Sequence, residues 1–107
     1  MGREEEAEKE YREAIRIKSD YPSAHNNLGY LLTKLGRWEE AEKEYREAIK
    51  ASSNYIVAYH NLGHLLRDWG KYKEAEKEYR KALDINPNYA EARNALGYAL
   101  VNLKRYS

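Results

Sequence analysis

The feature that most constrains this chain is an internal repeat of fixed period. Residues 27–48 return 34 residues later as residues 61–82, and the first half of the stretch returns again as residues 95–104. Its second half also stands at the start of the chain, at residues 2–14. A period of this length is typical of stacked arrays, in which each repeat buries its apolar face against its neighbours. The sequence therefore predicts a repeat array without one central core.

Apolar residues between the breaks of the chain are spaced for one face of a helix. In the first segment, Ala7, Tyr11, Ala14 and Ile15 follow the i, i+4, i+7, i+8 pattern. The same reasoning predicts helices over residues 3–18, 22–35, 38–51, 56–69, 72–85 and 90–103. Strand-like alternation is absent and the connections are short, which favours antiparallel neighbours. The predicted fold class is all-α, with six antiparallel helices.

Small residues recur where paired helices must approach one another. Gly29, Gly63 and Gly97 occupy one position of the repeat. Because they lack bulk, we expect them to allow close helix contacts, while Tyr45 and Tyr79 fill the remaining space.

Charge and composition exclude several classes of protein. Lys and Arg total 19 against 18 for Asp and Glu, which argues against a basic surface for nucleic acid or membrane. There is no cysteine, and no apolar run approaches the roughly 20 residues that span a bilayer. The acidic start differs from a signal peptide, so a soluble cytoplasmic protein is expected. No catalytic triad or phosphate loop stands out, and we expect neither enzymatic activity nor a cofactor.

The spacing of these residues resembles the tetratricopeptide repeat, whose units consist of a helix A and a helix B. In residues 56–89 the positions that carry the resemblance are Tyr59, Leu62, Gly63, Leu66, Ala75, Tyr79, Ala82 and Pro87. The resemblance covers the whole chain and implies one α-solenoid domain, residues 1–107. Half repeats at 1–21 and 90–107 would flank repeats at 22–55 and 56–89, in the helix order B-A-B-A-B-A. The similarity between copies suggests a recently duplicated or engineered array.

The resemblance also implies a concave groove lined by the A helices, where family members bind peptides. By position, the groove residues are Asn26, Asn27, Tyr30, His60, Asn61, His64, Arg67, Asn94 and Tyr98. Amide side chains can donate to and accept from a peptide main chain, so an extended peptide would suit this surface. The alternative is a solvated face without selectivity.

Two narrower hypotheses concern the same groove. Chaperone-binding family members hold C-terminal carboxylates in a clamp, but only Asn61 agrees with it here and Glu91 would repel a carboxylate. We reject that assignment. His60 and His64 are four residues apart on one helix face and could chelate Zn²⁺ or Ni²⁺. Because Asp68 is a poorly fixed third ligand, we favour two polar groove residues and expect no metal.

The predicted end helices suggest self-association. The last A helix would lack the B helix that covers its apolar face, and the first B helix would lack a preceding A helix. The residues expected at this contact are Ala7, Tyr11, Ile15, Leu96, Leu100, Leu103 and Tyr106. Exposed apolar faces favour burial. We therefore favour an engineered scaffold that self-associates into a dimer or open array; the alternative is an interaction module that binds an extended peptide.

Overall fold

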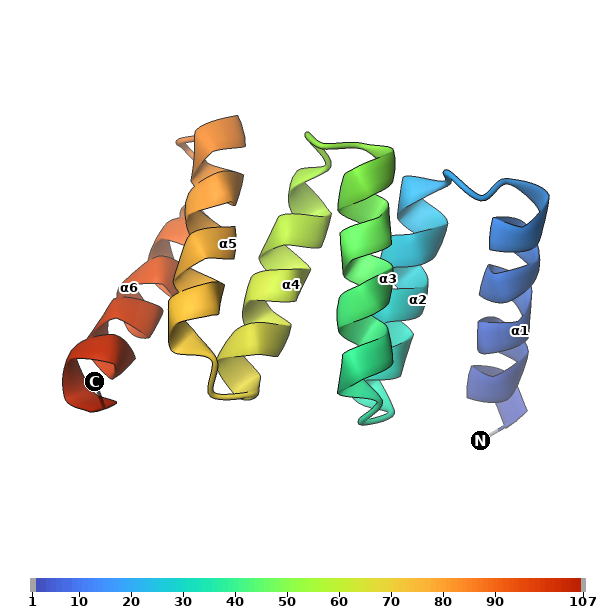
Figure 1. Cartoon of the computed structure of the whole chain (residues 1–107), viewed down its shortest axis with the longest axis horizontal. Helices are drawn as coiled ribbons and strands as arrows, with labels where there is room; N and C mark the ends of the chain where they lie inside the picture. Colours follow the sequence, from blue (N-terminus) through green and yellow to red (C-terminus); the bar gives the residue numbers. More distant parts are fainter. Residues whose placement is uncertain (1, 107) are drawn as a thin grey trace. The chain divides into compact units, whose positions relative to one another are not determined.

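A computed structural model describes residues 2–106, and these form six α-helices and no strand (Figure 1). The helices are α1 (Gly2–Ile17), α2 (Pro22–Lys34), α3 (Trp38–Ala51), α4 (Ile56–Asp68), α5 (Tyr72–Ile85) and α6 (Ala90–Tyr106). The predicted all-α class is confirmed, and the bounds of the first five helices agree with the expected ones to within one residue. Helix α6 continues three residues beyond its expected end at residue 103.

Glycines end two of the helices by adopting a backbone conformation that other residues avoid. Gly36 follows α2 with φ +78° and Gly70 follows α4 with φ +80°. After Gly36, the N–H of Arg37 donates to the carbonyl of Leu32 at 2.9 Å. Together with the bond from the N–H of Gly36 to the carbonyl of Thr33, this bond forms a Schellman motif. The same pair of bonds follows α4, where Lys71 and Gly70 are the donors. The left-handed glycine therefore sets where the chain turns into its next helix.

The described chain divides into two compact units. Unit 1 extends to Ala58 and unit 2 begins at Tyr59, so the division falls inside α4. In unit 1, α2 packs against both α1 and α3, and in unit 2, α5 packs against α6. The single domain and the repeat bounds expected from the sequence stay a prediction.

Each unit contains one close contact between a glycine and a buried tyrosine. A Cβ atom on Gly29 would lie 2.8 Å from the ring of Tyr45, and one on Gly63 would lie 2.5 Å from the ring of Tyr79. The two rings are 1% and 0% exposed. Since real Cβ atoms do not come this close to carbon, glycine is required at both positions. At Gly97, by contrast, a Cβ would meet no atom of the described chain within 4 Å.

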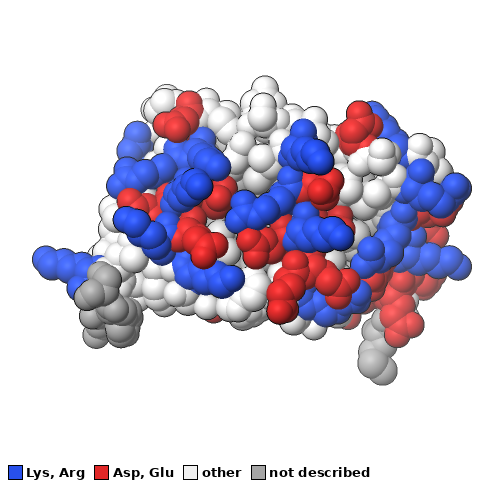
Figure 2. Space-filling model, viewed as in Figure 1, with Lys and Arg blue, Asp and Glu red and all other residues white. Residues whose placement is uncertain are grey.

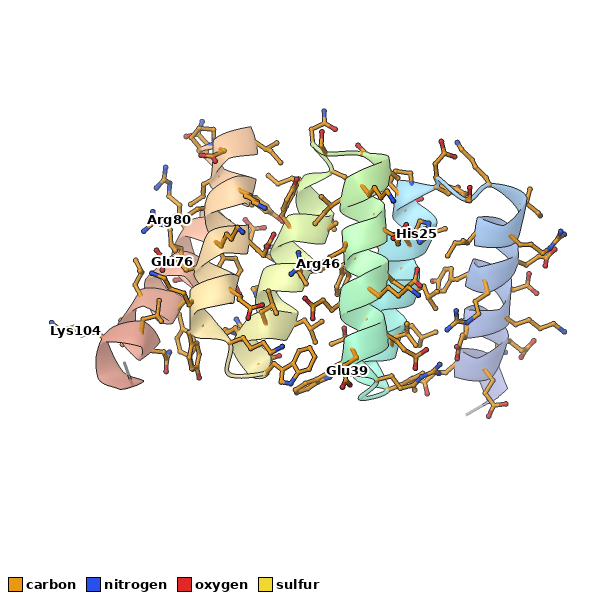
Figure 3. All side chains as sticks on the ribbon, in the orientation of Figure 1. His25, Glu39, Arg46, Glu76, Arg80 and Lys104 are labelled. Atoms are coloured by element: carbon orange, nitrogen blue, oxygen red, sulfur yellow. The ribbon has the colours of Figure 1, made fainter. Side chains whose placement is uncertain are left out.

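On the face shown in Figure 2, acidic and basic side chains are intermixed. Glu8 pairs with Arg12 at 3.0 Å on α1, and Glu76 pairs with Arg80 at 2.9 Å on α5, where Figure 3 labels both residues. Exposed pairs of this kind contribute about 0.3–0.5 kcal/mol each, so they tune the helices without holding the fold together. No helix in the described part of the chain combines the length and apolar character needed to cross a membrane.

Candidate functional site

Unit 2 contains a cavity of about 460 Å³ between α4 and α6. Its lining residues are His60, His64, Arg67 and Asp68 from α4, and Glu91, Asn94, Ala95 and Tyr98 from α6. Five of the predicted groove residues, two histidines among them, thus come together in one place. Their spacing along two helices explains this, because residues three or four apart share a helix face.

The two histidines of the cavity are both held in the neutral form near pH 7. Their ring centroids are 4.1 Å apart at an interplanar angle of 74°. Burial lowers the pKa of His64 to about 4 and also lowers the pKa of His60. His64 Nδ1 lies 2.7 Å from the hydroxyl of Tyr79, whose pKa burial raises to about 12. A neutral Tyr79 O–H can therefore donate to a neutral imidazole.

The remaining charges of the cavity belong to one cation and two carboxylates. The guanidinium of Arg67 lies 5.9 Å from the ring centroid of Tyr98 and pairs with Asp68 at 3.1 Å. Glu91, on α6, is close enough to His60 to oppose the lowering of its pKa by burial. With both histidines neutral, the carboxylates outnumber the cation, so the cavity disfavours an acidic ligand.

One buried polar atom of the cavity is unsatisfied. His60 Nδ1 has no hydrogen-bond partner among the described residues. Buried polar atoms nearly always have a hydrogen-bond partner, so we expect a ligand group or a water molecule to form a hydrogen bond with this nitrogen. The described residues contain no cluster of three or more His, Cys, Asp and Glu side chains suited to a metal ion.

The other predicted groove residues lie elsewhere. In α2, Tyr30 is 57% exposed and Asn27 is exposed, but Asn26 is only 5% exposed and so is not part of an open surface. Asn61 is half-buried on α4. Tyr79 is not among the residues predicted for the site, because no local pattern of the sequence reveals that α5 brings its hydroxyl to His64.

The face of α6 is partly covered by unit 2 itself. The sequence predicts that Leu96 stays uncovered unless a partner helix packs on it. It is only 8% exposed, so most of its side chain already lies in the core of the chain. Leu103 is half-buried. The side chain of Tyr106 lies outside the described residues.

The uncovered part of this face centres on Leu100. Its side chain is 40% exposed, whereas Leu32 and Leu66, which occupy the same position of the inner repeats, are fully buried. The neighbouring Val101 is 61% exposed. The leucine that the inner repeats bury at this position is therefore open on α6, whereas Val101 occupies the position of the half-buried Thr33 and Arg67.

Helix α1 also has apolar side chains that the rest of the chain does not fully bury. Ala7, Tyr11 and Ile15 are half-buried. The residues at the first two of these positions in α3, Ala41 and Tyr45, are at most 1% exposed. Helix α1 packs against α2, and these apolar side chains remain partly exposed.

Family profiles match the chain from end to end. A profile described as Tetratricopeptide repeat matches residues 20–88, another of the same description matches residues 78–107, and one described as TPR repeat matches residues 1–36. No curated protein matches the chain significantly.

Solved structures of similar fold include two domains of this kind. The first TPR domain of Spaghetti (RPAP3), bound to the HSP90 peptide SRMEEVD, is 26% identical with a TM-score of 0.90; the match covers 96% of this chain and 82% of that one. The Arabidopsis OM64 TPR domain is 23% identical with a TM-score of 0.85, over 92% of this chain and 81% of that one. These likenesses confirm the predicted α-solenoid fold class.

Proposed function

The chain belongs to the tetratricopeptide repeat family, and we propose that it is a non-enzymatic scaffold with two interaction surfaces. The first surface is the cavity of unit 2, which binds an extended peptide. The second consists of the open faces of α1 and α6, through which copies self-associate. The two surfaces use different residues, so they can be tested separately.

The observation that supports peptide binding is the cavity itself, with its convergent polar groups and an unsatisfied histidine nitrogen. Pockets of about 300–1,000 Å³ are typical of ligand sites. The Asn94 amide can donate to and accept from a peptide unit, and Tyr98 offers an apolar ring. The similar Spaghetti domain binds a peptide, which favours the same class of ligand here.

The charges of the cavity favour a neutral or basic peptide. Glu91 repels a carboxylate, and the charge of Arg67 is already shared with Asp68. A lysine or arginine side chain of the ligand would instead pair with Glu91. We expect the acidic peptide SRMEEVD to bind more weakly than a peptide of the same length with lysines in place of its glutamates.

The test is fluorescence anisotropy with both labelled peptides. Glu91→Lys should reverse the preference, and Asn94→Ala should weaken both peptides about equally. The matched control is Glu74→Lys, an exposed residue on α5 outside the cavity. Tight binding of SRMEEVD by the unaltered chain would contradict the charge argument, and no binding of either peptide would contradict the peptide hypothesis.

A specific observation also favours self-association. Leu100 exposes on α6 an apolar position that the inner repeats bury, and Ala7, Tyr11 and Ile15 of α1 are only half-buried. Fully burying one leucine or valine contributes about 1.5–3 kcal/mol, so a few such side chains can support micromolar pairing after the cost of association. The near-identical repeats, such as residues 41–48 against 75–82, favour an engineered origin for this scaffold.

Sedimentation velocity over a dilution series tests this second surface. A mass at or above twice 12.6 kDa that falls on dilution is expected. Leu100→Glu should give monomers, whereas Leu35→Glu, a change on an equally exposed leucine of unit 1, should not. A wild-type chain that stays monomeric throughout the series would refute self-association.

A further inference from the structure

Two contacts set the register between α2 and α3 in unit 1. The ring of Tyr45 lies over Gly29, where an added Cβ would be 2.8 Å away. One turn earlier on α2, His25 Nδ1 lies 2.8 Å from Glu44 Oε1 (His25 is labelled in Figure 3). Two contacts therefore join the helices. One is between a glycine and a tyrosine ring, and the other is between a polar side chain and a glutamate.

The same pair of positions is used in unit 2, between α4 and α5. Tyr79 lies over Gly63, with an even closer approach of 2.5 Å for an added Cβ. Glu78, which is 2% exposed, corresponds to Glu44, and Tyr59 corresponds to His25. Burial raises the pKa of Tyr59 and Glu78 raises it further, as expected for a carboxylate beside the phenol.

Helix α6 has the glycine and the polar residue of this arrangement, and α1 has the tyrosine and the glutamate. Gly97 and Arg93 occupy the glycine and polar positions of α6, and the surface over Gly97 is open. Tyr11 and Glu10 occupy the tyrosine and glutamate positions of α1, and neither is fully buried. Arg93 and Glu10 are opposite in charge, and Gly97 leaves open the place that a tyrosine ring occupies over Gly29 and Gly63.

The two charged residues are available for such a pairing. Neither Arg93 nor Glu10 forms an ion pair with another described residue, and both are exposed. Arg93 Nε donates to the carbonyl of Pro87 at 2.9 Å. A guanidinium has five N–H donors, so four remain for a carboxylate.

We propose that α6 of one copy receives α1 of a second copy in one register, with Tyr11 over Gly97 and Glu10 against Arg93. This inference rests on the proposed self-association and deepens it by naming the contacts that fix the geometry. The contact is heterologous, because the two copies contribute different surfaces, so further copies can add unless the assembly closes.

Charge reversal tests the register. In Glu10→Arg, the introduced cation faces Arg93 of the next copy, and in Arg93→Glu two carboxylates meet. Each variant alone should self-associate about tenfold more weakly, since like charges replace an ion pair at the contact. An equal mixture of the two variants should restore the wild-type affinity, because each copy then finds opposite charges on both of its faces.

The control variants reverse exposed charges of α1 at other positions. In Glu13→Lys the new lysine is the residue that α5 carries at the same repeat position, Lys81. Lys9→Glu changes the net charge by the same amount in the opposite direction. Neither should alter the dissociation constant more than about twofold, because exposed charges contribute little. Sedimentation velocity and size-exclusion chromatography follow all samples.

The outcomes separate the two claims. Weakened single variants and a restored mixture support the register. If the wild type self-associates but Glu10→Arg and Arg93→Glu behave like it, the register is wrong and self-association stands. The register is also wrong if both variants weaken assembly but their mixture does not recover it. A wild-type chain that remains monomeric overturns both claims.

Discussion

Gly29, Gly63 and Gly97 occupy the same position of the repeat, yet replacing them by alanine should not change stability in the same direction. Gly97→Ala should stabilise the fold, whereas Gly29→Ala and Gly63→Ala should destabilise it. Alanine in the interior of a helix is favoured over glycine by about 1 kcal/mol. At Gly97 no described atom opposes this gain, because an added Cβ would meet none of them within 4 Å. At Gly29 and Gly63 the Cβ would stand 2.8 Å and 2.5 Å from buried tyrosine rings.

Those rings cannot move aside without disturbing the core. Tyr45 and Tyr79 are 1% and 0% exposed, and overpacking of this kind costs about 1–3 kcal/mol. Gly97→Ala should therefore raise the free energy of unfolding by about 0.5–1 kcal/mol. Gly29→Ala should lower it by up to about 2 kcal/mol, and Gly63→Ala by more, since its approach is closer.

Urea denaturation followed by circular dichroism, at a concentration where copies do not associate, measures these changes. At high concentration Gly97→Ala should also weaken self-association, because the added methyl group occupies the space proposed for Tyr11. Destabilisation of the dilute chain by Gly97→Ala as large as that by Gly63→Ala would contradict the open space at Gly97. Equal stabilisation by all three variants would contradict the close approach of the tyrosine rings.

Two further predictions concern individual side chains. Folding lowers the pKa of His64 from 6.5 to about 4, so the unfolded chain binds the extra proton and stability falls as the pH drops from about 6.5 to 4. Between pH 7 and 4, wild type should lose about 1–2 kcal/mol more than His64→Gln in parallel melts, after allowance for partial exposure; equal losses would contradict a buried neutral imidazole. Gly36→Ala should cost about 1–2 kcal/mol because φ is +78°, whereas Gly36→Asn, which tolerates this conformation, should cost less; equal melting temperatures for both variants and wild type would contradict backbone strain.

The helices could be predicted from the sequence because their causes are local. The i, i+4 spacing of apolar residues, Pro22 at the first position of α2 and the glycines at the helix ends act within a few residues. The 34-residue period then assigned the same role to equivalent residues, and this was right for Gly29 and Gly63. Five residues predicted for the groove also met in one cavity, since each lies on the expected face of its helix.

Periodicity could not show where equivalent residues differ. Gly97 repeats Gly63 in sequence, yet one is open and the other lies under a tyrosine, because a neighbouring helix covers only the second. Leu96 is buried although the repeat pattern left it uncovered, and the low pKa of His64 depends on burial at a place where Tyr79 from α5 lies against its ring. Helix formation follows from short-range interactions along the chain, whereas burial and pKa values depend on atoms that only packing brings together.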